Sequence, residues 1–287
     1  MGLIATVGLV LHPRRDCTPA MQTVVRWARD RGATVLGLAE EVARIDGGAI
    51  AVDELTLAAR ADLVVSMGGD GTMLRALRLA QGQRAPVLGV NLGRLGFLAE
   101  IDIPELDGAH SAIDEHRFTV ETRSAVRAEF PGGTTTAFND VALVRVPGRG
   151  GSAVVELQVE GNRFLRYAAD AVVVATPTGS TAYSFSAGGP IVSPRVEGML
   201  VIPSAPHSAF NRALFLSPGE ALALHVLPTS GELAVEADGI LVGEAGPGDV
   251  IDVVMVPAAA NVVRLGRTTF YQRAQRRLGL AGSTEAD

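Results

Sequence analysis

The sequence predicts an α/β protein with a mostly-β second part: an N-terminal doubly wound α/β domain, a second β-sandwich-like domain, and a C-terminal helix returning to the first domain. Up to about residue 116, apolar β-branched runs alternate with helical patterns, whereas after residue 118 short strands are separated by Gly-rich and Pro-rich turns. Helical spacing returns at 270–278. We therefore expect one domain over residues 1–118 with 266–287, and a second over 119–265.

The first domain is expected to hold two clear helices between buried strands. Thr18 and Pro19 give an N-cap and a first-turn proline, and Gly32 is a stop signal, so a helix is predicted between them. Trp27 lies at helical spacing from apolar residues, which favours a core position. A second helix is predicted at 73–80. Buried strands are predicted at residues 4–11, 34–38, 63–67 and 86–90.

The second domain contains two predicted hairpins. In the first, strands at 157–160 and 163–167 flank the turn Gly161-Asn162. In the second, strands at 233–237 and 240–242 flank Asp238-Gly239. Gly, Asn and Asp suit these turns because they tolerate the positive φ that two-residue hairpin loops need.

Composition excludes several classes of protein. The 287 residues carry a net charge of −6, which argues against a nucleic-acid partner. All 25 basic residues are Arg and Lys is absent. Without Lys there is no Walker A loop, no protein-kinase site and no pyridoxal phosphate Schiff base. A single cysteine, Cys17, and no run long enough for a membrane span favour a cytoplasmic protein without a membrane partner.

The run Gly68-Gly69-Asp70-Gly71-Thr72 joins a predicted strand to a predicted helix. Such a turn presents bare backbone N–H groups at a helix N-terminus, which suits an anion such as phosphate. A carboxylate at that point holds a cation, pairs with an Arg, or takes a proton from a nucleophilic hydroxyl, and the last option describes a kinase. The alternative is that Asp70 and Thr72 only cap a helix after a tight turn.

A second stretch, Thr176 to Pro190, is dense in hydroxyls and glycines and carries no charge. Its hydroxyl and backbone groups can bind a purine edge or a ribose, with Tyr183 or Phe185 supplying a ring face. An ordinary Ser/Thr-rich turn is the alternative.

Four blocks together resemble the NAD kinase family, in the diacylglycerol kinase-like superfamily. They are Gly68–Thr72, Gly89–Leu98, Asn139-Asp140 and Thr176–Pro190, the last being the closest match. The first block is shared with diacylglycerol and sphingosine kinases, so it indicates only the superfamily, and the last selects the NAD kinases. The resemblance implies transfer of a phosphoryl group from ATP or polyphosphate to the 2′-hydroxyl of the adenosine ribose of NAD, giving NADP.

The resemblance also implies roles for individual residues. Asp70 is the catalytic acid-base residue, and Mg²⁺ comes with ATP, with no protein metal ligand expected. The phosphate-binding residues are Gly68, Gly69, Gly71 and Thr72. The NAD-binding residues are Asp70, Gly71, Arg75, Phe97, Asn139, Asp140, Asp170, Thr181, Ala182, Tyr183, Ser184 and Ser186. The family further implies a homodimer or homotetramer.

This chain departs from the family pattern near Asp170. Ala171 and Ala168 stand where the family usually has Gly and often Arg, and Ile240 follows a turn often followed by Gln. We hypothesise that Arg166 replaces the missing cation, since alternate residues share one face of a strand. The departures also motivate a non-catalytic NAD(P) sensor as a rival reading, and a lipid kinase is another.

Two other groups of side chains are interpreted without catalytic roles. His207 has no neighbouring Cys or paired acid, which favours a loop role over metal ligation. Arg273, Arg276 and Arg277 lie at helical spacing and are predicted to form a solvated face.

Overall fold

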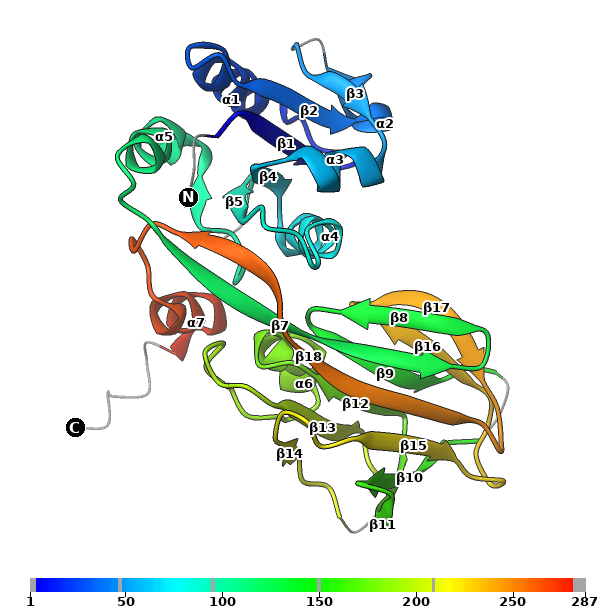
Figure 1. The fold of residues 1–287 in the computed structure, drawn as a ribbon. Coiled ribbons are helices and arrows are strands. Elements are labelled where there is room, and N and C mark those ends of the chain that lie inside the picture. The colour runs from blue at the N-terminus through cyan, green and yellow to red at the C-terminus, as the bar shows by residue number, and fades with distance from the viewer. Residues whose placement is uncertain (1–3, 46–47, 94–95, 149–150, 208–209, 281–287) are drawn as a thin grey trace, which may run out of the picture. The chain divides into compact units, whose positions relative to one another are not determined.

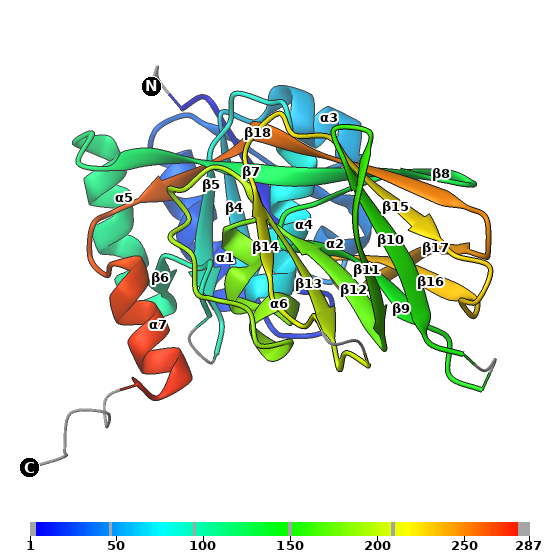
Figure 2. The same cartoon turned by 90° about the horizontal axis from the view of Figure 1, so that it is seen from below.

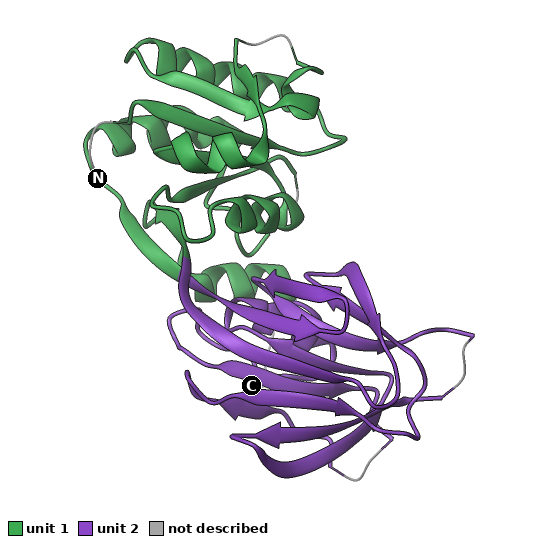
Figure 3. Cartoon of the chain, turned by 45° about the vertical axis from the view of Figure 1, so that its right-hand side comes forward, with its two compact units in different colours: residues 1–122, 260–287 green, residues 123–259 purple. Residues whose placement is uncertain are grey.

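The structure is a computed structural model that describes residues 4–45, 48–93, 96–148, 151–207 and 210–280. The chain divides into two compact units, unit 1 (residues 1–122 with 260–287) and unit 2 (residues 123–259), coloured separately in Figure 3. The chain leaves unit 1 within strand β7 (Thr119–Phe130) and returns within strand β18 (Val250–Arg264).

Unit 1 is built on a parallel sheet with the strand order β5-β4-β1-β2-β3 (Figure 1). Its strands are β1 (Thr6–Leu11), β2 (Thr34–Leu38), β3 (Ile50–Val52), β4 (Leu63–Gly68) and β5 (Val87–Asn91). The short β6 (Ile101–Asp102) and Val262 of β18 also pair parallel with β5. The chain runs outward in opposite directions from β1 and β4, so the predicted doubly wound topology is confirmed, with its switch point between those two strands.

Helices cover both faces of this sheet, as Figures 1 and 2 show. They are α1 (Thr18–Arg29), α2 (Ala39–Val42), α3 (Glu54–Arg60), α4 (Asp70–Leu79), the 3₁₀ turn η1 (Ile103–Glu105) and α5 (Leu106–Asp114). The C-terminal helix α7 (Phe270–Leu278) also belongs to unit 1. Side chains of β1 alternate between the faces: Val7 and Leu9 join the core beneath α1 and α5, and Gly8 faces Leu57 of α3.

Several predicted boundaries in unit 1 can now be compared with the structure. The first predicted helix and the core position of Trp27 are confirmed, and Gly32 adopts φ 68° three residues past the helix end. The N-cap prediction was wrong, because Thr18 is the first helical residue and Cys17 is the N-cap, without a side-chain cap bond. The helix predicted at 73–80 begins three residues earlier, at Asp70. The short elements α2, α3 and β3 were not predicted, because each offers too few residues for a clear period, and α5 was not predicted either.

Unit 2 contains two antiparallel sheets around one core. One sheet has the order β11-β10-β15-β18, with β7 beside β18 and β8 beside β7, and the other has the order β14-β13-β12-β9-β16-β17. Their other strands are β8 (Gly133–Ala137), β9 (Asp140–Arg145), β10 (Ala153–Val159), β11 (Asn162–Ala169), β12 (Ala171–Ala175), β13 (Met199–Ser204), β14 (Leu214–Leu216), β15 (Leu222–Val226), β16 (Leu233–Ala237) and β17 (Ile240–Ala245). Buried residues of both sheets, such as Val155 and Val172, share one cluster, so the β-sandwich-like prediction is confirmed.

The two predicted hairpins are present, one with a shifted turn. Asp238 and Gly239 have φ of 50° and 74° between β16 and β17, as the sequence predicted. In the other hairpin the turn is Glu160-Gly161, with φ of 52° and 74°, and Asn162 already pairs with Val159. The prediction of Gly161-Asn162 was therefore wrong by one residue, since the strand register places Gly161 second in the turn.

Candidate functional site

The glycine turn lies at the carboxyl end of β4, beside the switch point of the unit 1 sheet. Ligands of open α/β sheets bind at this edge and at this point of the topology. Gly69 is the N-cap of α4 and Asp70 its first residue. Gly68 and Thr72 are buried against each other, and a Cβ on Gly68 would overlap the Thr72 hydroxyl. Gly71 is exposed with open space around it, so an anion can approach the helix N-terminus.

The Asp70 carboxylate is held by the second sequence block. Phe97 N–H donates to Asp70 Oδ2 and Leu98 N–H donates to Asp70 Oδ1, both at 3.0 Å. A Cβ on Gly96 would overlap this carboxylate, so the chain can approach it only with glycine there. Each carboxylate oxygen keeps lone pairs for a further partner. The structure thus brings Gly68–Thr72 and Gly96–Leu98 together around one half-buried acid.

Arg75, predicted to contact NAD, lies one turn further along α4. Its guanidinium donates to Leu11 O at 2.7 Å and forms an ion pair with the buried Glu41. Glu41 in turn accepts from Leu11 N–H at 2.6 Å. These bonds attach α4 to the end of β1. The predicted contact between Arg75 and NAD stays a prediction.

In unit 2, the Asn139-Asp140 pair is attached to the hydroxyl-rich loop. Thr176 N–H donates to Asn139 O at 2.8 Å, and the Thr176 hydroxyl donates to Phe138 O at 2.6 Å. The same hydroxyl accepts from Gly179 N–H at 3.0 Å. A Cβ on Gly179 would overlap the Asn139 backbone. The two blocks that the sequence placed in the NAD-binding site are therefore in direct contact.

Asp140 is only 4% exposed and lies near two other acids. The pKa of Asp140 is raised from its ordinary value of 3.8 to about 7, chiefly by burial and also by the negative charges of Asp238 and Glu236, against a backbone hydrogen bond from Tyr183 that lowers it. Asp238 itself accepts from Asn139 N–H at 2.7 Å. Asp140 therefore changes charge near neutral pH, which the sequence alone did not indicate.

The loop after Thr176 presents side chains of graded exposure. It forms a 3₁₀ turn, η2 (Thr178–Thr181), and a short helix, α6 (Tyr183–Ser186). Ser180 is buried and its hydroxyl bonds Pro177 O and Val192 N–H, which closes the loop on itself. Of the predicted NAD-binding residues in this loop, Thr181, Ala182 and Tyr183 are half-buried, Ser184 is buried and Ser186 is exposed.

Around Asp170 the structure offers a cation that sequence reasoning missed. Arg145 Nε lies 2.6 Å from Asp170 Oδ1, and His207 Nε2 lies 3.7 Å from the same oxygen. Arg166, proposed as the replacement cation, instead bonds Glu156 across the β10–β11 hairpin at 2.8 Å. Arg145 lies beside Asp170 because β9 pairs with β12, and the sequence alone does not show that pairing.

One expectation about charged residues was wrong. Arg273 is 3% exposed and lies 3.2 Å from Glu100 Oε2, whereas Arg276 and Arg277 are exposed. The solvated face of α7 therefore consists of Arg276 and Arg277, because Arg273 is buried and pairs with Glu100.

Among the described residues, no group of three or more His, Cys, Asp or Glu is placed to hold a metal ion. No helix in the described part of the chain is both long and apolar enough to cross a membrane.

A fixed carboxylate beside an open helix N-terminus, at the switch point of a parallel sheet, fits the class of phosphotransferases that act on a hydroxyl group. Comparison with known proteins gives the family. Residues 50–118 match the ATP-NAD kinase N-terminal domain and residues 138–265 match the ATP-NAD kinase C-terminal domain. The chain belongs to the NAD kinase family.

Individual relatives agree with this assignment. NAD kinase 1 of Streptomyces avermitilis is 38% identical, over 99% of this chain and 89% of that protein. The NAD kinase of Desulforamulus reducens is 35% identical, over 95% and 96% respectively. The crystal structure of yeast NADH kinase with NADH superposes with a TM-score of 0.84 at 26% identity, over 99% of this chain and 90% of that one. An Archaeoglobus fulgidus NAD kinase solved with ATP shares the fold, with a TM-score of 0.68 at 24% identity, over 96% and 97%.

The family and the relatives settle the activity. The chain is an ATP-dependent enzyme that phosphorylates NAD to NADP, as the sequence predicted. Two rivals considered for the sequence, a lipid kinase and a non-catalytic sensor, are thereby set aside.

Proposed function

We propose that Asp70 is the general base of this reaction. The 2′-hydroxyl oxygen of the adenosine ribose bonds to the γ-phosphorus of ATP, and the bond from that phosphorus to the β–γ bridging oxygen breaks. The hydroxyl proton passes to the Asp70 carboxylate, and ADP leaves. The observation that carries this proposal is the pair of 3.0 Å hydrogen bonds from Phe97 and Leu98, which fix both oxygens of an acid at an anion-binding turn.

The phosphate-binding part of the proposal rests on the turn itself. Gly68, Gly69, Gly71 and Thr72 would hold phosphate oxygens at the N-terminus of α4, where the helix dipole favours negative charge. Mg²⁺ is bound in proteins largely by substrate phosphates with one or two carboxylates, so the ion would arrive with ATP. When bound, that ion would neutralise charge on the transferring phosphoryl group.

In unit 2, we assign the ribose hydroxyls to Asn139 and Asp140 and the adenine to the loop over Thr181–Ser186. A buried acid next to an amide side chain can donate or accept toward a hydroxyl, and the half-buried Tyr183 ring offers a face to a purine. Asp170 would bind the nicotinamide half. Supporting this set is the contact between the two blocks through Thr176 and Gly179.

The decisive test of the base is Asp70→Asn, measured as NADP formation from NAD, ATP and Mg²⁺. General acid–base catalysis contributes about 100- to 10,000-fold, so kcat should fall by about 1,000-fold while NAD still binds. Asp53→Asn is the matched control, since Asp53 also lies at the start of a unit 1 helix and caps Thr56 N–H at 2.7 Å. An Asp70→Asn enzyme with wild-type turnover would refute the assignment.

The cation at the nicotinamide end is tested by a pair of variants. Arg166→Ala should lower the affinity for NAD if Arg166 fills the role proposed from the sequence. Arg145→Ala should lower the affinity for NAD if Arg145, the ion-pair partner of Asp170, is the cation at this end of the site. Titration of each variant with NAD, monitored by calorimetry, separates the two, and unchanged affinity in Arg166→Ala would remove Arg166 from the site.

Three further parts of the proposal concern conditions and assembly. A coupled assay across donors distinguishes ATP from polyphosphate as the preferred phosphoryl source. We propose a homodimer or homotetramer, which sedimentation measurements test directly. We also propose a cytoplasmic location, supported by the single cysteine, Cys17, which is a free and buried thiol.

A further inference from the structure

The position of the Asp70 carboxylate depends on a short segment that follows Gly96. Two successive N–H groups of this segment, from Phe97 and Leu98, form the hydrogen bonds to its oxygens. A shift of about 1 Å in a catalytic group can cost about 100-fold in rate. Whatever fixes Leu98 therefore fixes the catalytic carboxylate.

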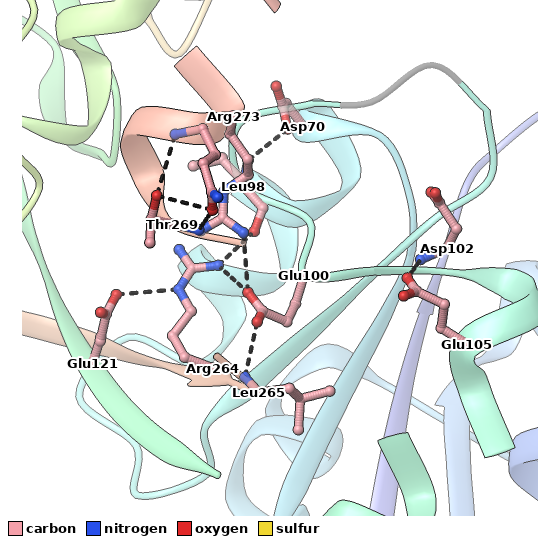
Figure 4. A network of polar contacts seen from close by, with 11 residues as sticks. Asp70, Leu98, Glu100, Asp102, Glu105, Glu121, Arg264, Leu265, Thr269 and Arg273 are labelled. Carbon is pink, nitrogen blue, oxygen red and sulfur yellow. Dashed lines mark hydrogen bonds and ion pairs between the residues drawn. The ribbon is translucent and has the colours of Figure 1, made fainter. Parts of the chain in front are cut away.

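Leu98 is held from behind by Arg264, a residue of β18. Arg264 Nη1 donates to Leu98 O at 3.4 Å and to Glu100 Oε2 at 2.8 Å, as Figure 4 shows. The segment is also tied to the sheet, because Glu100 N–H donates to Gly89 O at 2.9 Å. One guanidinium thus contacts both the carbonyl of Leu98 and the acid two residues later.

Glu100 is the centre of a buried network of charges (Figure 4). Its side chain is 1% exposed, and Oε2 also accepts from Arg273 Nη1 at 3.2 Å. Its other oxygen accepts from Leu265 N–H at 2.8 Å. Arg264 Nε completes the network with Glu121 Oε2 at 3.1 Å. These carboxylates and guanidiniums carry opposite charges, and they link β18 and the C-terminal helix α7 to the Leu98 segment.

Stability alone is a poor reason for this arrangement. Apolar residues of similar volume often replace a buried ion pair without loss of stability, because removing charges from water costs more than their attraction returns. Burial lowers the pKa of Arg273, and the neighbouring positive charge of Arg264 lowers it further. Arg273 Nε also has no hydrogen-bond partner among the described residues. A geometric requirement explains why such a network lies directly behind Leu98.

We propose that Arg264 is a positioning residue for the catalytic base: it holds Leu98 through its carbonyl and through Glu100, so that the N–H groups of residues 97 and 98 orient Asp70. Arg273 extends the same network to α7, which makes the C-terminal helix part of the catalytic support. This inference rests on the proposed role of Asp70 and names what aligns it.

The test is Arg264→Met, which keeps the volume of the stem and removes the guanidinium. We expect kcat to fall by about 100-fold, with KM for NAD and for ATP changed by no more than about twofold, because alignment in the transition state is lost and substrate binding is not. Arg264→Lys should recover part of kcat, since it keeps a charge beside Glu100 without the fork that reaches Leu98 O. Arg31→Met is the control, since it also breaks an arginine–carboxylate pair of unit 1, here with Asp114.

A double variant separates this inference from the role of Asp70. In the Asp70→Asn background, Arg264→Met should cost no further turnover, because the group that it aligns is already absent. A further 100-fold loss there would overturn the positioning role. An inactive Asp70→Asn enzyme beside an Arg264→Met enzyme with wild-type kcat would overturn this inference and leave the base assignment intact. If Asp70→Asn keeps its turnover, the base assignment itself is wrong.

A second route covers the case in which Arg264→Met does not fold, as judged by circular dichroism. Arg264→Lys and Arg273→Met then carry the test, each with its melting temperature measured beside its kinetics. Reduced kcat with unchanged KM in a variant folded at the assay temperature supports the proposal. Wild-type kcat in both variants overturns it.

Discussion

Unit 1 and unit 2 each present one aspartate at a candidate site, and the surroundings of the two acids differ. Asp70 is half-buried and accepts two backbone N–H groups, with guanidiniums behind the segment that donates them. Asp140 is buried at the start of β9 and has Asp238 and Glu236 as its charged neighbours. The first setting holds a carboxylate in one orientation. The second suits an acid that is neutral or charged according to pH.

The difference has a consequence for the reaction. A base must be aimed at the hydroxyl before its proton is transferred, and the two N–H donors hold the Asp70 carboxylate in one orientation. A ribose-binding acid gains from being able to donate as well as accept, which a raised pKa provides. We propose that Asp70 serves the chemistry and Asp140 the recognition of the ribose, and four changes test that division.

We expect the largest effect from Asp140→Asn, which should change the free energy of unfolding. Because the folded state raises the pKa of Asp140 above its value of 3.8 in the unfolded chain, the native state binds the extra proton between pH 4 and pH 7. The protonated Asp140 makes its full contribution to the free energy of unfolding below pH 4, and this contribution is lost as pH rises through about 7. Asparagine is neutral at every pH. The free energy of unfolding of the variant should therefore exceed that of wild type by up to about 4 kcal/mol above pH 7, and the two should be equal below pH 4.

Urea unfolding of both proteins from pH 4 to pH 8 measures this difference. Glu41→Gln is a contrasting variant, since Glu41 is buried but bonded to Arg75 and to Leu11 N–H, so it should lose stability. A stability difference between Asp140→Asn and wild type that does not vary with pH would contradict the raised pKa.

Two glycines give the next test, one at each site. Gly179→Ala places a Cβ into the Asn139 backbone, which cannot rotate away. Overpacking of this kind costs about 3 kcal/mol of folding stability, and we expect a correspondingly lower urea midpoint and weaker NAD binding. Gly71→Ala, which meets nothing within 4 Å, is the control and should melt like wild type.

Gly96→Ala differs because its Cβ meets the Asp70 side chain, which can rotate. The expected outcome is a folded enzyme with kcat lowered by about 100-fold, since the base leaves its donors. Steady-state kinetics beside a thermal melt separate the two effects. Equal losses of stability in Gly96→Ala and Gly179→Ala would show that the two sites are built alike.

Sequence reasoning reached the local parts of these sites and missed the distant ones. A strand, a glycine turn and a helix start adjoin in the chain, so the setting of Asp70 within Gly68–Thr72 could be predicted. The donors of Asp70 lie 27 and 28 residues away, and only the resemblance placed Phe97 near the site. Arg273 looked solvated because helical spacing says nothing of Glu100, 173 residues earlier.

The same reason applies to the partner of Arg166, which the sequence did not indicate. Alternation along one strand put it on the face of Ala168, but the hairpin register gives it to Glu156 instead. Arg145 reaches Asp170 because β9 and β12 are neighbours in the sheet, which is a matter of topology. These ion pairs join residues that are far apart in the chain, and a single sequence does not show which strands pair or which charged residues meet.

The smallest expected effect concerns Thr176, whose hydroxyl links the two NAD-site blocks. Thr176→Val keeps the shape and leaves Phe138 O without its donor and Gly179 N–H without its acceptor, both in buried positions. Buried unsatisfied groups cost about 1 to 3 kcal/mol, so we expect about 2 kcal/mol less stability and a raised KM for NAD with little change in kcat. Thr176→Ser keeps the hydroxyl and should behave like wild type. A fall in kcat at constant KM in Thr176→Val would mean that unit 2 aligns the reacting groups as unit 1 does, and the division between recognition and chemistry would then fail.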